Sequence, residues 1–184
     1  MTYIKTAIEG VYILEPKVFE DARGYFMETW RESDFNAAIG HPVDFIQDNQ
    51  SKSSRGVLRG LHYQRGNDAQ AKLVRVLQGE VLDVAVDLRS DSPTFGQHVA
   101  VVLSAENKRQ LFIPRGFAHG FQVLSDEAVF TYKVDNHYAP ESEASIRYDD
   151  PVLNIKWPIS APAEVVLSEK DLTHAVSFQD AEKF

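Results

Sequence analysis

The stretch Val81-Leu82-Asp83-Val84-Ala85-Val86-Asp87-Leu88 carries the most information about the fold class. Side chains along a β-strand alternate between two faces, and here apolar residues occupy both alternating sets of positions. A pattern of this kind is typical of a strand that other parts of the molecule cover on both sides. We therefore predict that residues 81–88 form a strand buried on both faces.

Other segments have the same character: they are short, rich in Val, Leu, Phe or Tyr, and separated by Gly, Asn, Asp, Ser or Pro. They are Val11–Val18, Phe45–Gln50, Val57–Tyr63, Lys72–Leu77, His98–Leu103, Leu111–Pro114, Phe117–Leu124 and Ala128–Val134. Many short strands at near-regular spacing predict an all-β sandwich or barrel.

Helix-forming sequence is scarce. Arg31–Ile39 is the best candidate, because Gly40 follows it as a suitable C-cap. A second, short helix is expected to begin after Ser168, which suits an N-cap. The tail from Pro151 carries three prolines, so we expect it to wrap the sheet rather than extend it. Residues 1–184 contain no repeat or linker, and we expect one domain.

Composition narrows the class of function. The chain has 184 residues, 43% of them apolar, which is ordinary for a folded protein. A net charge of −8 argues against nucleic acid as the main partner. No apolar run is long enough for a membrane span and the N-terminus lacks a signal-peptide pattern, so we expect a cytoplasmic protein with no membrane partner. The absence of cysteine excludes disulfides, thiolate metal sites and cysteine nucleophiles.

Two histidine-containing stretches are candidates for chemistry. In RGVLRGLHYQ, residues 55–64, strand geometry places Gly60, His62 and Gln64 on one face, with room for a ligand beside the glycines. In IPRGFAHG, residues 113–120, a Pro-Gly turn leads into a strand that carries His119. Strand pairing could bring both histidines into one cavity. A purely structural histidine beside a bulge is the alternative.

Other polar residues allow two readings each. Arg23 lies at a turn, whereas Arg59 and Lys72 lie on expected strands and could point inward. Several converging cations would form a phosphate clamp, although solvated surface positions are the usual case. Tyr132 and Tyr138 are either residues at the edge of the core or, for a phenol in a cavity, a general acid.

The chain resembles the dTDP-4-dehydrorhamnose 3,5-epimerase family, a cupin-type jelly-roll family, over nearly its whole length. The matching stretches occur in order: DARGYF (21–26), QDNQS (47–51), GVLRGLHYQ (56–64), KLVRV (72–76), GEVLDVAVDL (79–88), SPTFG (92–96), IPRGFAHGF (113–121), YKVDNHY (132–138) and SEKD (168–171). The resemblance implies a cupin-type double-stranded β-helix with a few short peripheral helices.

The resemblance also implies an isomerase that inverts C3 and C5 of dTDP-4-dehydro-6-deoxy-D-glucose, giving dTDP-4-dehydro-L-rhamnose in dTDP-L-rhamnose biosynthesis. His62 would be the general base, with Asp171 as its partner and Asp83 as a second choice. Lys72 would stabilise the enolate oxygen, and Tyr132 would return a proton from the opposite face.

The substrate-binding residues implied by the resemblance are Arg23, Glu28, Gln47, Asp48, Asn49, Arg59, Lys72, His119, Tyr138, Glu143 and Lys170. Arg23, Arg59 and Lys170 are assigned to the pyrophosphate, and Tyr138 to the thymine or the sugar. The family is typically homodimeric, with an N-terminal segment that reaches the partner's sheet. Arg23 and Glu28 are therefore candidates for the site of the other subunit.

No cofactor or metal is expected. The cupin metal pattern reads His-x-His with a following Glu, then Pro-x-Gly-x-x-His. Here Gln64 stands where the second His belongs, so that only His62 and His119 remain as ligands. Three alternatives stay open: a related dTDP-4-keto-sugar 3-epimerase or 3,4-ketoisomerase, a non-catalytic sugar-nucleotide-binding barrel, and a metal-dependent cupin oxygenase.

Overall fold

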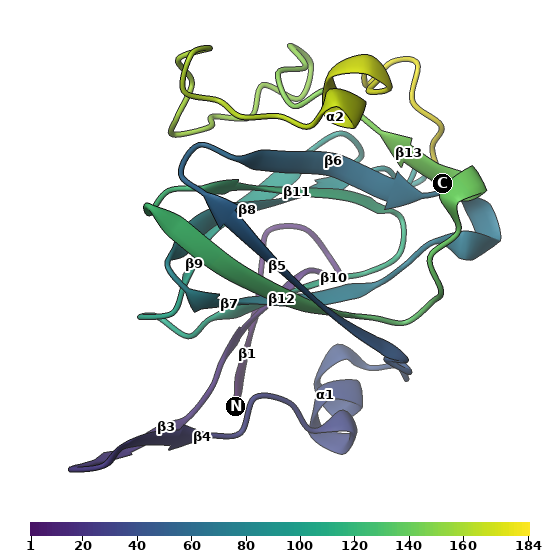
Figure 1. The fold of residues 1–184 in the computed structure, drawn as a ribbon. Helices are drawn as coiled ribbons and strands as arrows, with labels where there is room; N and C mark the ends of the chain where they lie inside the picture. The colour runs from purple at the N-terminus through teal and green to yellow at the C-terminus, as the bar shows by residue number, and fades with distance from the viewer.

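The computed structural model describes residues 1–184, which form two facing antiparallel sheets (Figure 1). The six-stranded sheet has the order β1 (Thr2–Lys5), β2 (Tyr12–Glu15), β10 (Gln110–Ile113), β7 (Lys72–Gln78), β12 (Glu127–Val134) and β5 (Gln47–Ser54). The five-stranded sheet has the order β13 (Glu143–Ser145), β6 (Leu58–Gln64), β11 (Phe117–Val123), β8 (Glu80–Asp87) and β9 (His98–Ser104). The all-β prediction is confirmed.

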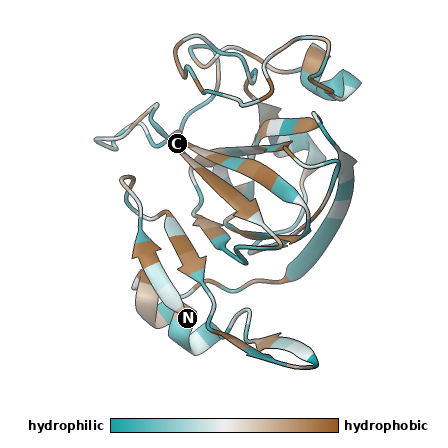
Figure 2. Ribbon diagram, turned by 90° about the vertical axis from the view of Figure 1, so that its left-hand side faces the viewer, coloured by the Kyte–Doolittle hydropathy of each residue, from teal (hydrophilic) through white to brown (hydrophobic).

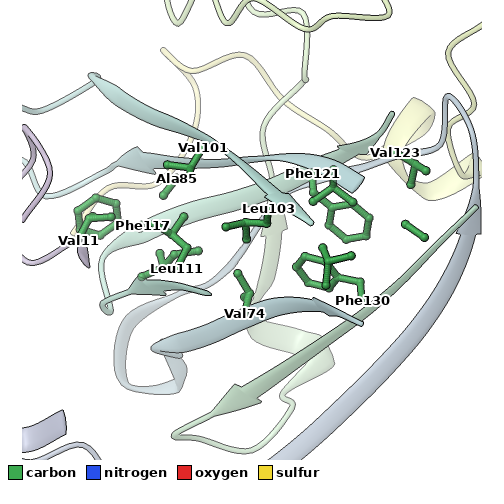
Figure 3. Close-up of a cluster of buried hydrophobic side chains, with 14 of the residues drawn as sticks. Val11, Val74, Ala85, Val101, Leu103, Leu111, Phe117, Phe121, Val123 and Phe130 are labelled. Atoms are coloured by element: carbon green, nitrogen blue, oxygen red, sulfur yellow. The ribbon is translucent and has the colours of Figure 1, made fainter. Parts of the chain in front are cut away.

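The central strand β8 explains the layering. Its inward side chains, Val81 and Ala85, belong to the core between the two sheets, which Figure 3 shows. The alternate side chains, such as Val84, pack on the other face in a second cluster. The tail contributes Trp157 and Phe178 to that second cluster, so it covers the outer face of the five-stranded sheet. The predictions of a strand buried on both faces and of a wrapping tail are confirmed.

The helices are short and peripheral, as expected. Helix α1 (Glu32–Ile39) ends at Gly40, whose φ of 85° is the left-handed conformation that glycine adopts without strain. Helix α2 (Glu169–Thr173) begins after Ser168, whose side chain accepts a hydrogen bond from the Asp171 backbone N–H. Two single 3₁₀ turns are formed by Gly66–Asp68 and Pro140–Ser142. Neither α-helix has the length and apolar character needed to cross a bilayer.

Two strand predictions were wrong in detail. The expected strand Val11–Val18 is interrupted at Pro16, because proline cannot donate to a ladder, and the chain continues as β3 (Val18–Asp21). The strand expected at Phe45–Gln50 instead begins at Gln47 and runs on through polar residues to Ser54. Pairing with β12 along its whole length stabilises this polar segment. Strands β1 and β13 were not predicted.

A hairpin projects from the body of the molecule. It consists of β3 and β4 (Gly24–Met27), and it extends away from both sheets in Figure 1. Figure 2 shows hydrophobic residues along the strands of the packed sheets and both hydrophobic and hydrophilic residues along the hairpin. Phe26 is 71% exposed there, and Phe19 and Tyr25 are also exposed. The hairpin therefore presents apolar side chains that this chain does not cover.

Candidate active site

A cavity of about 360 Å³ opens between the two sheets. The six-stranded sheet contributes Lys72 from β7 and Tyr132 from β12, and the five-stranded sheet contributes His62 from β6. The remaining lining residues are Gln47, Asn49, Tyr63, Gln64, Gln70, Tyr138 and Glu143. A second chamber shares His62, Lys72 and Tyr132, and it adds Gln50, Ser51, Arg59, His119, Phe121 and Phe130. Residues from distant parts of the sequence thus meet in one continuous site.

A β-bulge places two functional residues of β6 on the same face. On β11, His119 lies opposite His62 and Phe121 lies opposite Arg59, so β6 carries one extra residue in this interval. Arg59 and His62, three positions apart, therefore both line the cavity. The expected common face of Gly60, His62 and Gln64 is accordingly wrong for Gly60, which lies at the bulge against the β11 backbone.

His62 is held by the tail of the chain. Its Nε2 lies 2.5 Å from Asp171 Oδ1 on α2, and the Asp171 side chain is only 5% exposed. The Ser168 hydroxyl donates to the other carboxylate oxygen at 2.7 Å. Burial alone would raise the pKa of Asp171, but the hydrogen bonds from His62 and Ser168 lower it below the usual value. The carboxylate therefore stays charged beside the imidazole.

The second candidate partner, Asp83, lies elsewhere. Both of its oxygens are 3.0 Å from Nε2 of His119 at the base of the cavity. Burial lowers the pKa of His119, and the Asp83 carboxylate opposes that effect. The structure thus contains two separate His–Asp pairs, of which the one with His62 lies nearer the opening.

Lys72 and Tyr132 have opposite electrostatic tendencies. Burial lowers the pKa of Lys72 to about 8, although Asp83 and Glu143 act in the opposite direction. Burial raises the pKa of Tyr132, so its phenol keeps the proton at neutral pH. The cavity therefore offers an imidazole on one sheet and a protonated phenol on the facing sheet, with an amine beside them.

Comparisons with known proteins identify the family. The family model described as dTDP-4-dehydrorhamnose 3,5-epimerase matches residues 5–180. The chain belongs to this epimerase family. A relative of that name from Salmonella typhimurium is 60% identical over 171 residues, which cover 93% of this chain and 92% of the relative. The resemblance expected from the sequence is confirmed, and the chain is an isomerase of sugar nucleotides.

Solved structures have the same fold. The dTDP-4-dehydrorhamnose 3,5-epimerase from Elizabethkingia anophelis is 54% identical with a TM-score of 0.94, and the match covers 100% of this chain and 99% of that one. The epimerase from Legionella pneumophila, solved in complex with dTDP-4-keto-L-rhamnose, is 52% identical with a TM-score of 0.90, covering 95% and 92% of the two chains. The expected jelly-roll architecture is thereby confirmed.

The mouth of the epimerase cavity is polar. Tyr138 donates its phenol hydrogen to Glu143 Oε2 at 2.5 Å, and the Lys170 ammonium donates to the same oxygen. Gln47 donates to Asn49 Oδ1 at 2.8 Å on β5. These residues form a rim of donors and acceptors around the opening.

Some of the expected binding residues lie outside this cavity. Asp48 forms an ion pair with Lys133 at 2.9 Å on the opposite face of β5, because alternation sends its neighbours Gln47 and Asn49 inward. Within this chain Asp48 therefore does not line the cavity with Gln47 and Asn49, and its assignment to substrate binding stays a prediction. Arg23 is 90% exposed and pairs with Asp21 on the hairpin, and Glu28 pairs with Arg31.

Other lining residues were not anticipated. Gln70 reaches the cavity from the loop before β7, and Phe121 and Phe130 form its apolar floor. Gln70 belongs to no recognisable pattern, and the two phenylalanines look like ordinary core residues in the sequence.

Metal-binding geometry is also absent, because no three His, Asp or Glu side chains are clustered as a metal ion requires.

Proposed function

We propose that this epimerase inverts C3 and C5 of dTDP-4-dehydro-6-deoxy-D-glucose through enolate intermediates, giving dTDP-4-dehydro-L-rhamnose. The observation that carries the proposal is that His62 and Tyr132 line one cavity from facing sheets. A sugar ring bound between them would present one face to the imidazole and the other to the phenol. That arrangement suits inversion at a carbon next to a ketone.

Proton removal is assigned to His62. Both C3 and C5 are adjacent to the C4 ketone, so loss of either proton leaves an enolate whose charge is on oxygen. Asp171 would fix the tautomer of His62 and stabilise the imidazolium that forms. Lys72, as an ammonium, would place positive charge at the enolate oxygen. Removing and returning a proton leaves the oxidation state of the sugar unchanged, so this route uses no redox cofactor.

Proton return is assigned to Tyr132. If His62 returned the proton it had removed, the original configuration would be restored. A donor on the opposite face gives the inverted product. Burial keeps Tyr132 protonated, which suits a general acid.

Binding of the nucleotide is assigned to the rest of the site. Arg59 in the second chamber and Lys170 at the rim are the cations available in this chain for the pyrophosphate. Tyr138 offers an exposed ring for stacking on the thymine or the sugar. The polar groups of Gln47, Asn49, His119 and Glu143 would contact nucleotide or sugar oxygens.

We also propose a homodimer in which Arg23 and Glu28 serve the site of the second copy. Both lie on or beside the projecting hairpin, outside the cavity of their own chain, and the exposed Phe26 gives the hairpin an apolar surface to bury. Light scattering would measure the mass. Mixing Arg23→Ala with His62→Asn protein should restore up to about a quarter of the activity if the sites are shared, because one site of a mixed dimer is then intact. A monomeric mass would contradict this assembly.

The reaction itself is tested by turnover in deuterated buffer followed by NMR. Deuterium at both C3 and C5, with inverted product, is the expected result. Label at C3 alone would favour a 3-epimerase, a migrated ketone would favour a 3,4-ketoisomerase, and nucleotide binding without exchange would favour a non-catalytic barrel. The single domain over residues 1–184 and the cytoplasmic location remain proposals, which limited proteolysis and cell fractionation would test.

A further inference from the structure

Asp83 is a buried carboxylate to which the proposed reaction gives no role. It lies on β8 between Val81 and Ala85, whose side chains belong to the core between the sheets. Its exposed fraction is 0%. Placing a carboxylate among aliphatic side chains is unfavourable unless other groups compensate its charge. The surroundings of Asp83 must therefore supply that compensation.

His119 satisfies the hydrogen-bonding needs of Asp83 without balancing its charge. Its Nε2 is 3.0 Å from both carboxylate oxygens, so one N–H serves both. Burial lowers the pKa of His119, which favours a neutral ring at neutral pH. A neutral imidazole can donate a hydrogen bond, but it leaves the negative charge of Asp83 uncompensated.

The cation on which Asp83 acts is the Lys72 ammonium. It lines the same chamber as His119, and Asp83 acts to raise the pKa of Lys72 against the effect of burial. No salt bridge within the chain involves the Lys72 ammonium. The carboxylates that favour its charged form, Asp83 first and then Glu143, therefore act on it without a direct ion pair.

We propose that Asp83 is a positioning residue whose carboxylate, oriented by His119, is the buried counter-charge that keeps Lys72 an ammonium in the active site. The inference rests on the proposed enolate role of Lys72. Asp83 and Lys72 form no direct ion pair, and the His119 ring holds the carboxylate in place. Asp83 would thus act on the reaction without touching the sugar.

Other ionisable groups also face Lys72 and must be separated from Asp83 in a test. They are His62 and Arg59 on β6, His119 on β11, Tyr132 on β12, Tyr138 in the segment between β12 and β13, and Glu143 on β13. Asp83→Asn removes the charge at nearly the same side-chain shape, and its amide oxygen can still accept from His119. Asp150→Asn is the matched control, since Asp150 is also buried, accepts backbone hydrogen bonds at the tail and lies outside the cavity.

The experiment follows the Lys72 side chain directly by NMR of protein labelled with ¹³C at lysine Cε, with Lys72→Met identifying the resonance. In the wild type Lys72 should titrate at about 8. In Asp83→Asn the midpoint should fall by about one pH unit or more, and in Asp150→Asn it should not move. An unchanged midpoint in Asp83→Asn would overturn the proposal. If Asp83→Asn does not fold, Asp83→Ser replaces it in the experiment, because serine removes the same charge with a smaller side chain.

The pH profile of kcat links the titration to the reaction. The alkaline limb should move downward in Asp83→Asn by the same interval as the Lys72 resonance. A purely structural Asp83 would lower the melting temperature, as Asp150→Asn does, and leave both the resonance and the limb in place, which would contradict the proposal. Because the NMR titration needs no substrate, a wild type without epimerase activity would refute the proposed function and leave this test intact.

Discussion

Asp171 and His62 are separated by 109 residues in the chain, and their side chains meet at 2.5 Å. The contact depends on two short parallel bridges that fasten the tail to the five-stranded sheet. Val166 pairs with Val57 before α2, and Val176 pairs with Ile146 after it. Helix α2 is thereby held over β6, with Asp171 turned toward the imidazole. The proposed general base and its carboxylate partner are thus brought together from the barrel and from the segment that wraps it.

Replacing Asp171 by Asn should lower kcat and change the pH dependence of stability. The folded-state pKa of Asp171 lies below its reference value of 3.8, so the charged form stabilises the fold above that pH. This contribution is lost as pH falls through the folded-state pKa. Denaturant unfolding should therefore show a wild-type advantage at pH 7 that shrinks below about pH 4. An advantage that is the same at all pH values would contradict the hydrogen bonds assigned to the charged carboxylate.

Replacing His62 by Asn should abolish turnover and retain nucleotide binding. Loss of a general base lowers the rate by about 10²–10⁴-fold, whereas the proposed dTDP contacts lie on other residues of the cavity. Product measured in samples quenched at fixed times gives the rate, and calorimetry with dTDP gives the affinity. Turnover equal to that of the wild type would remove His62 from this role.

Replacing Tyr132 by Phe should separate proton exchange from inversion. His62 can still remove a proton and return one from solvent on the same face. In deuterated buffer the sugar should therefore gain label while keeping its original configuration, as NMR would show. Normal yields of the inverted product from Tyr132→Phe would rule out the phenol as the proton donor.

Replacing Lys72 by Met should lower kcat more than it raises KM, because the ammonium is needed most when charge develops on the enolate oxygen. In the wild type, Lys72 loses its proton as pH rises past about 8, so kcat should decline there. Steady-state kinetics across pH checks both expectations. A kcat that is unaffected by Lys72→Met would dismiss the enolate role.

Replacing Gly60 by Ala should destabilise the protein strongly. A Cβ at Gly60 would lie 2.5 Å from Gly120 Cα, and the residue has φ of +126°. Gly24→Ala is the matched control, because its φ of +128° is similar and nothing lies within 4 Å. Backbone strain alone costs about 1–3 kcal/mol. Gly60→Ala should therefore lose more unfolding free energy than Gly24→Ala, because its Cβ is also crowded. Equal unfolding free energies for the two variants would show that the close approach at the bulge is unimportant.

Local patterns in the sequence predicted the layers of the fold well. The apolar residues on both faces of Val81–Leu88 predicted a strand covered on both sides, and Gly40 marked the end of α1. The polar strand Gln47–Ser54 was misplaced because its stability comes from pairing with β12 rather than from its own side chains. Propensity describes a segment alone, and this segment is a strand only beside its neighbour.

The sequence by itself determined the all-β class, the family and the kinds of side chain available for acid–base chemistry. Only the tertiary structure decided which of them meet. A one-residue bulge brings Arg59 into the cavity beside His62, strand alternation sends Asp48 out of it, and the docked tail supplies Asp171 to His62 while Asp83 pairs with His119. Periodicity is a local property of the chain, whereas register and packing join residues that the chain places far apart.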